Sequence, residues 1–132
     1  EELPLTTRVH ETVQANADYL GFAPHLDVSG PLDDVGEELG DQLIPALTEI
    51  LSNVARHAEA TTVRVAIECS GDSLVLEVVD DGIGIDPDAP RGNGLGNLAH
   101  RALVLGGGFV ATANPEVGGT VVRWWAGTDS SD

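Results

Sequence analysis

The spacing of apolar residues predicts two helices in the first half of the chain. From about Thr6 to Tyr19 apolar side chains recur every three or four positions, and Gly21 follows as a helix-ending residue. A longer stretch, from about Glu37 to Ala58, repeats this pattern and predicts a helix with one buried side. Pro45 lies inside it, so we expect either a kink or the start of the regular helix there. The buried stripe should consist of Leu43, Leu47, Leu51, Val54 and Ala58.

Alternation of apolar and polar residues predicts strands. The runs Thr62–Cys69 and Ser73–Asp80 alternate, are rich in β-branched residues, and are joined by Ser70-Gly71-Asp72 as a hairpin loop. Shorter runs predict three further strands, each next to a Gly- or Pro-containing turn signal. These strands are expected at His25–Ser29, Phe109–Ala113 and Thr120–Trp125.

The remaining segments complete a single domain. A loop rich in Gly, Asp and Pro fills Asp81–Gly94, and Leu95–Leu105 predicts a third helix that ends at Gly106. Helices interleaved with mostly hairpin-connected strands predict a two-layer α/β (α+β) sandwich. At 132 residues the chain fits one compact domain, which we assign to residues 1–126, with 127–132 as a disordered tail.

Charge narrows the classes of partner. The formal net charge is −16, and all six cations are Arg. High acidity also accounts for simple solubility, but a surface this acidic repels nucleic acid and anionic membranes, so neither is an expected partner. Binding a polyphosphate would need a divalent cation and backbone N–H groups to neutralise the ligand.

Other features of the composition suggest where the chain belongs. The first residue is Glu1 and no secretory leader follows, so we expect the chain to be part of a longer protein. The single cysteine, Cys69, excludes an internal disulfide and suits the cytosol. No apolar run approaches the roughly 20 residues that a membrane span needs.

The long helix carries the first group of candidate functional residues. Glu49, Asn53 and His57 lie four residues apart, so they line one side within an arc of roughly 80°. A carboxylate on this side could polarise a nucleophile, and an amide oxygen is a hard ligand suited to Mg²⁺. Three polar residues alone describe an ordinary solvated helix face equally well.

The second group follows the strand Ser73–Asp80. In Asp80-Asp81-Gly82-Ile83-Gly84 the glycines allow a sharp turn that leaves a carboxylate at the strand tip. That carboxylate can accept a hydrogen bond from an exocyclic amine such as that of adenine. Asp and Gly are also the commonest turn residues, so a plain turn remains open.

Two further glycine-containing segments follow. Gly92-Asn93-Gly94-Leu95-Gly96-Asn97 opens the third predicted helix, where free N–H groups and the helix dipole favour phosphate. The segment is no dinucleotide fingerprint, because no βαβ unit surrounds it. A flexible linker into the helix is the alternative interpretation of this segment.

The last motif, Gly118-Gly119-Thr120, enters the final strand. There the Thr120 hydroxyl could share a water or a base with Asp80, unless the segment is only a hairpin turn.

Taken in order, these four motifs resemble the N, G1 and G2 boxes of the GHKL ATPase superfamily, which includes gyrase, Hsp90, MutL and histidine kinases. The resemblance covers nearly all of the chain. It implies the Bergerat fold, with a mixed, mostly antiparallel sheet packed on three helices. The segment Asn97–Ala102, the Leu-Gly-Gly at Leu105–Gly107 and the strand Gly118–Val122 are similar to histidine kinases of the NarX/DegS/DesK type. A weaker similarity, at Leu20–Phe22 and Gly30–Asp33, is to actinobacterial DevS/DosT-like sensors.

The resemblance implies ATP and Mg²⁺ as ligands and a role for each motif residue. Asp80 would bond the adenine amine, with Gly82, Gly84 and Thr120 completing the base pocket, and Asn53 would coordinate Mg²⁺. His57 is a candidate phosphate contact, and Glu49 would polarise or position the nucleophile. Amide groups near the third predicted helix would hold the polyphosphate, at Gly92, Gly94, Leu95 and Gly96.

The implied activity is that of a protein-histidine kinase in a cytoplasmic two-component system. The γ-phosphoryl group would pass to a His on a phosphoacceptor helical hairpin of the same full-length kinase, and then to a response regulator. Two alternatives stay open. One is a GHKL serine kinase of the anti-sigma-factor type, and the other is an interaction module that keeps the fold without nucleotide.

Overall fold

The computed structural model describes residues 4–30, 32, 37–55, 60–70, 73–82, 106–113 and 119–127. These residues form two helices and five strands. In chain order they are α1 (Leu5–Leu20), β1 (His25–Ser29), α2 (Glu37–Asn53), β2 (Val63–Ser70), β3 (Ser73–Asp80), β4 (Gly108–Ala113) and β5 (Thr120–Gly127).

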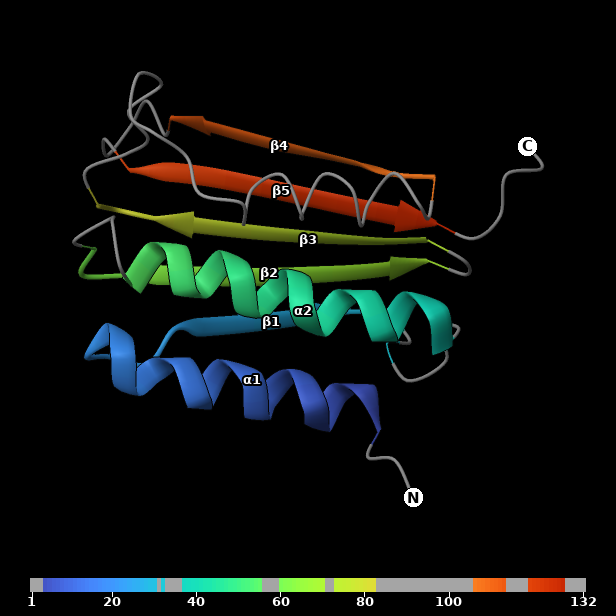
Figure 1. Cartoon of the computed structure of the whole chain (residues 1–132), viewed down its shortest axis with the longest axis horizontal. Helices are drawn as coiled ribbons and strands as arrows, with labels where there is room; N and C mark the ends of the chain where they lie inside the picture. The colour runs from blue at the N-terminus through green and yellow to red at the C-terminus, as the bar shows by residue number, and fades with distance from the viewer. Residues whose placement is uncertain are drawn as a thin grey trace.

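The strands form one mixed sheet in the order β1-β2-β3-β5-β4. β1 pairs with β2 in parallel, whereas the other neighbouring strands pair antiparallel. Both helices lie on the same side of the sheet, with α2 over its middle and α1 beside α2 (Figure 1). The parallel β1–β2 pair is connected through α2, as parallel pairing requires a crossover. The predicted two-layer α/β sandwich is therefore confirmed; the third predicted helix, Leu95–Leu105, lies outside the described residues.

Helix α1 closely matches its predicted extent. Val9 and Val13 are buried along one side, as the apolar spacing indicated, and Leu5 extends this side by one turn. Gly21 ends the helix in the left-handed conformation at φ 87°, and its N–H donates to the Ala17 carbonyl at 2.9 Å. Only glycine adopts this conformation without strain, which explains the stop.

Helix α2 begins at Glu37 as predicted, so Pro45 lies inside the helix rather than at its start. Its regular α-helical part ends at Asn53, earlier than the sequence pattern indicated, and the next two residues form a wider π-type turn. Residues 56–59, which include Ala58, lie outside the described part. The sheet-facing side of α2 is fully buried and contacts β3 and β5. Neither α1 nor α2 is long and apolar enough to cross a bilayer.

The core lies between the helices and the sheet. Alternate residues of β3 point toward the helices and are buried, namely Leu74, Leu76, Val78 and Asp80. The two adjacent tryptophans of β5 separate as expected: Trp124 is fully buried, and Trp125 is 36% exposed on the other face. Opposite Trp125 lies Gly108, where a Cβ would come within 2.5 Å of the indole, so glycine makes room for the ring.

The strand ends differ slightly from the predictions. β4 begins at Gly108 and β5 continues to Gly127, which takes the last strand one residue into the expected tail. Residues 128–132 lie outside the described part of the chain.

Candidate functional site

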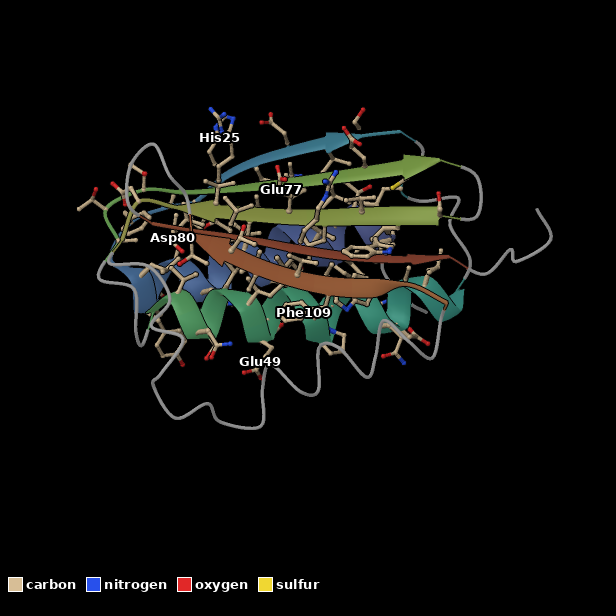
Figure 2. The ribbon with its side chains drawn as sticks, turned by 90° about the horizontal axis from the view of Figure 1, so that it is seen from above. His25, Glu49, Glu77, Asp80 and Phe109 are labelled. Atoms are coloured by element: carbon tan, nitrogen blue, oxygen red, sulfur yellow. The ribbon has the colours of Figure 1, made fainter. Side chains whose placement is uncertain are left out.

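The site begins with two side chains at the same end of the sheet. Asp80 is the last residue of β3, Thr120 is the first residue of β5, and the two are partners in the antiparallel ladder. Asp80 is 3% exposed and Thr120 is 5% exposed. Figure 2 shows the Asp80 carboxyl on the helix side of the sheet, at the strand tip. The alternation that buries the β3 core residues also turns Asp80 inward.

The Asp80 carboxylate is oriented by backbone groups on both sides. Its Oδ1 accepts a hydrogen bond from the Gly82 N–H at 2.8 Å, so Gly82 holds the carboxylate rather than simply permitting the turn. Burial raises the pKa of Asp80, while hydrogen bonds from the Gly82 and Thr120 backbone oppose the rise and the charge of Asp81 adds to it. Two donors do not saturate a carboxylate, which has about four acceptor positions. The carboxylate of Asp80 can therefore still accept a hydrogen bond from a ligand amine.

Gly119 also belongs to the site, although the sequence did not show that it packs against Asp80. A Cβ at this position would lie 1.8 Å from the Asp80 carbonyl oxygen and 2.6 Å from the carbonyl carbon. Only glycine lets the start of β5 come this close to the tip of β3. The sequence showed Gly118-Gly119 as a turn signal, but it did not show which backbone the turn approaches.

Asp81 is the second residue whose contacts the sequence did not reveal. Its Oδ1 accepts hydrogen bonds from the N–H groups of Thr61 at 2.7 Å and Thr62 at 2.9 Å. Its Oδ2 accepts one from the Thr61 hydroxyl at 2.5 Å. Thr61 and Thr62 come before β2, so no local sequence pattern links them to Asp81.

The polar side of α2 approaches the same end of the molecule. Asn53 is the last residue of α2, and α2 ends where β3 ends and β5 begins (Figure 1). Asn53 and Glu49 are both partly exposed. Glu49 extends from the side of α2 that faces away from the sheet (Figure 2). The structure therefore brings Asp80, Gly82 and Thr120 together, with Asn53 at the same end and Glu49 one turn earlier, directed outward.

The other predicted site residues lie outside the described residues and stay predictions. They are His57, Gly84, Gly92, Gly94, Leu95 and Gly96.

The chemistry of the described residues fits a nucleotide with a bound cation. A buried carboxylate with spare acceptor positions suits the amine of a base. The side-chain oxygens of Asn53 and Glu49 are hard donors of the kind that Mg²⁺ prefers. The aliphatic core residues next to Asp80 exclude water from the carboxylate and so strengthen a hydrogen bond made there.

Residues 38–128 match the family described as histidine kinase-, DNA gyrase B- and HSP90-like ATPases. The match covers more than half of the chain and includes α2 and strands β2 to β5. The chain belongs to this ATPase family. The GHKL resemblance and the ATP-binding type of domain are thereby confirmed, while the finer branch within the family is not.

Sensor histidine kinases are among the named proteins to which this ATPase domain is similar. The chain is 31% identical over 121 residues to the sensor histidine kinase NarS of Mycobacterium tuberculosis, with 87% of this chain and 28% of NarS covered. It is 36% identical over 87 residues to the sensor histidine kinase LnrJ of Bacillus subtilis, with 66% of this chain and 22% of LnrJ covered. The chain thus spans about a quarter of the length of these relatives.

Solved structures of the family share the fold. The ATP-binding domain of PrrB from Mycobacterium tuberculosis superposes with a TM-score of 0.67 at 22% identity, covering 97% of this chain and 96% of that one. The blue-light activated histidine kinase EL346 of Erythrobacter litoralis superposes with a TM-score of 0.72 at 22% identity, covering 98% of this chain and 47% of that one. The predicted Bergerat architecture is therefore confirmed in this ATPase domain.

Proposed function

We propose that this chain is the ATP-binding catalytic domain of a two-component sensor histidine kinase. In this proposal the domain positions ATP so that the γ-phosphoryl group passes to a His on a phosphoacceptor helical hairpin elsewhere in the full-length kinase. A response regulator is the next acceptor. The relatives named as sensor histidine kinases support the proposal, and the buried Asp80 facing Thr120 is the observation that carries it.

Each residue has a proposed part in this function. The adenine amine donates to Asp80, and Thr120, with Gly84, completes the base pocket. Asn53 binds Mg²⁺, which offsets phosphate charge in a chain whose own net charge is −16. His57 and the N–H groups near Gly92, Gly94, Leu95 and Gly96 contact phosphate.

Glu49 has the least direct role. Its outward direction suits a carboxylate that meets an incoming acceptor better than one that touches the base. Because the nucleophile is a His from another domain, Glu49 orients or polarises that imidazole in this proposal.

The branch of the family and the cellular location of the domain are also part of the proposal. We infer the NarX/DegS/DesK branch from the segments Asn97–Ala102 and Gly118–Val122. The weaker similarity to DevS/DosT-like sensors lies at Leu20–Phe22 and Gly30–Asp33. We place the domain in the cytoplasm, as its resemblance to two-component kinases implies and as its single cysteine suits. Its strongly acidic composition argues against contact with nucleic acid or membrane.

Calorimetric titration with Mg-ATP tests the nucleotide site through Asp80→Asn. The amide keeps the shape of the side chain but replaces one acceptor oxygen with a donor that faces the adenine amine. We expect the variant to bind Mg-ATP roughly 10- to 100-fold more weakly, the size of a lost charged hydrogen bond. The control is Asp27→Asn on β1, whose side chain is 63% exposed and lies away from the site, and which should bind like the wild type. Equal affinities for Asp80→Asn and wild type, or no binding by the wild type, would contradict the proposal.

Phosphoryl transfer separates the kinase from the two alternatives. The domain is mixed with labelled ATP and the separately produced phosphoacceptor hairpin of its full-length kinase. We expect label on the hairpin that is lost in acid, as phosphohistidine is. Acid-stable label on a serine of an anti-anti-sigma partner would support the serine kinase instead. A domain that neither binds Mg-ATP in calorimetry nor transfers label would support the interaction module.

A further inference from the structure

Asp81 forms a compact set of hydrogen bonds that we name the Asp81 clamp, made of Thr61, Thr62 and Asp81. Both carboxylate oxygens are used, since Oδ1 accepts the two threonine N–H groups and Oδ2 accepts the Thr61 hydroxyl. In addition, the Asp81 N–H donates to the Thr62 carbonyl at 3.3 Å. Four hydrogen bonds therefore join one residue after β3 to two residues before β2.

The clamp joins two segments that carry different parts of the proposed site. Thr61 lies eight positions after Asn53, on the connection between α2 and β2. Asp81 directly follows Asp80, the proposed adenine contact. Val63 and Asp80 are already partners in the β2–β3 ladder, so the clamp extends this pairing beyond the strand ends.

The clamp contributes little to the core of the domain. Thr61 and Thr62 are exposed, and Asp81 is partly exposed. Hydrogen bonds in contact with water contribute little net stability, and the β2–β3 pair is already held by a ladder of eight register partners and a buried apolar face. The clamp also places a second negative charge beside the buried Asp80, which raises the pKa of Asp80 further. A carboxylate at this position thus has an electrostatic cost without a large gain for the core.

A bound nucleotide would span both segments. In the proposed site the base reaches Asp80 at the tip of β3, while the cation on the phosphates reaches Asn53 at the end of α2. Both contacts form together only when the two elements keep their relative positions, and errors of about 1 Å in such a site are costly.

Resting on the proposed function, we propose that Asp81 is a positioning residue that couples the base-binding tips of β3 and β5 to the cation-binding end of α2. Asp81 itself touches neither base nor cation in this proposal. It holds Thr61 and Thr62, just before β2, against the strand that carries Asp80.

The loss of affinity is expected to depend on which parts of the nucleotide the ligand contains. Asp81→Ala should bind Mg-ATP about tenfold more weakly in calorimetry, because both halves of the site must be engaged. Adenosine engages only the base-binding half, so its affinity, measured by protein-observed NMR titration, should change by less than about twofold. A general loosening of the fold would instead weaken both ligands alike.

Conservative variants separate positioning from charge. Asp81→Asn retains an oxygen for the two threonine N–H groups, and its amide can donate to the Thr61 hydroxyl, so we expect it to restore most of the affinity for Mg-ATP. Thr61→Val removes one clamp bond and should weaken Mg-ATP binding in the same direction, whereas Thr61→Ser should not. Asp27→Ala removes one charge elsewhere and should bind both ligands like the wild type. If Asp81→Ala does not fold, the Thr61→Val and Thr61→Ser pair decides.

The possible failures differ from one another. Unchanged Mg-ATP affinity in both Asp81→Ala and Thr61→Val would overturn the positioning role alone. An equal loss for Mg-ATP and adenosine would also overturn it, because the effect would then be a general distortion. A wild type that binds neither ligand would overturn the proposed function, and the positioning role with it.

Discussion

Two adjacent aspartates at the end of β3 have opposite environments. The alternation of β3 buries its last residue, Asp80, against the helices, while Asp81, just past the strand, lies in contact with solvent. Burial raises the pKa of Asp80. The hydrogen bond from the Thr61 hydroxyl, followed by those from the Thr62 and Thr61 N–H groups, lowers the pKa of Asp81 to about 2. The same residue type therefore serves as a ligand acceptor in one position and as a structural clamp in the next.

These environments predict opposite pH dependences of stability. Because the pKa of Asp80 is raised above 3.8 on folding, the folded state binds the Asp80 proton more tightly than the unfolded chain does. The contribution of Asp80 to the free energy of unfolding is therefore complete below pH 3.8 and falls as pH rises through the raised pKa. Asp81 stabilises the fold fully above 3.8, and this contribution is lost as pH falls toward about 2.

Urea unfolding across this pH range measures both effects. The free energy of unfolding of wild type minus that of Asp80→Asn should decrease with rising pH. The same difference for wild type and Asp81→Asn should increase with rising pH. Slopes of the same sign for the two pairs would contradict the environments described here.

At the scale of elements, the site depends on how closely β5 approaches β3. The close contact of Gly119 with the Asp80 carbonyl brings Thr120 opposite Asp80. Helix α2 adds a second constraint, because its buried side packs on the sheet while Asn53 lies at its end. Three elements thus meet at one end of the domain.

A single methyl group should disturb this arrangement. Gly119→Ala would place a Cβ 1.8 Å from backbone, which cannot move without separating the strands. We expect a loss of about 3 kcal/mol in the free energy of unfolding, as for overpacked cores, together with weaker Mg-ATP binding.

Gly40→Ala is the matched control. Its Cβ would meet only the flexible end of Leu5, at 3.3 Å, and alanine favours helix over glycine. Thermal or urea unfolding should show unchanged or higher stability for Gly40→Ala. A similar loss for both variants would mean that the strand contact is not the cause.

At the scale of the whole molecule, charge is the dominant feature. With 22 acidic side chains and six Arg, the folded chain concentrates like charges that the unfolded chain spreads apart. The ion pair between Arg8 and Asp41, at 3.8 Å, is only partly buried and contributes little against this repulsion.

Screening should therefore stabilise the domain. Raising monovalent salt from about 10 mM to about 150 mM shortens the Debye length from roughly 30 Å to roughly 8 Å. We expect the melting temperature, measured by circular dichroism without nucleotide, to rise over this range. A melting temperature that falls with salt would show that attractive pairs outweigh the net repulsion.

The sequence by itself determined the elements whose signal is local. The 3.6-residue period and the terminal Gly21 predicted α1 closely, and strict alternation predicted β2 and β3, because buried faces impose those periods on the chain. Periodicity was less reliable at the end of α2, where apolar spacing continued past Asn53 although the regular helix did not. Four weak motifs in the right order were also enough to indicate the ATPase family, as the match over residues 38–128 bears out.

Only the tertiary structure decided which of these residues meet. The pairing of Thr120 with Asp80, the backbone contact that requires Gly119, and the hydrogen bonds from Thr61 and Thr62 to Asp81 join segments about 20 to 40 residues apart. Each arises from strand order and register, which depend on how whole faces pack. No local period in the chain encodes such a pairing, so the site could be anticipated by residue type but not by geometry.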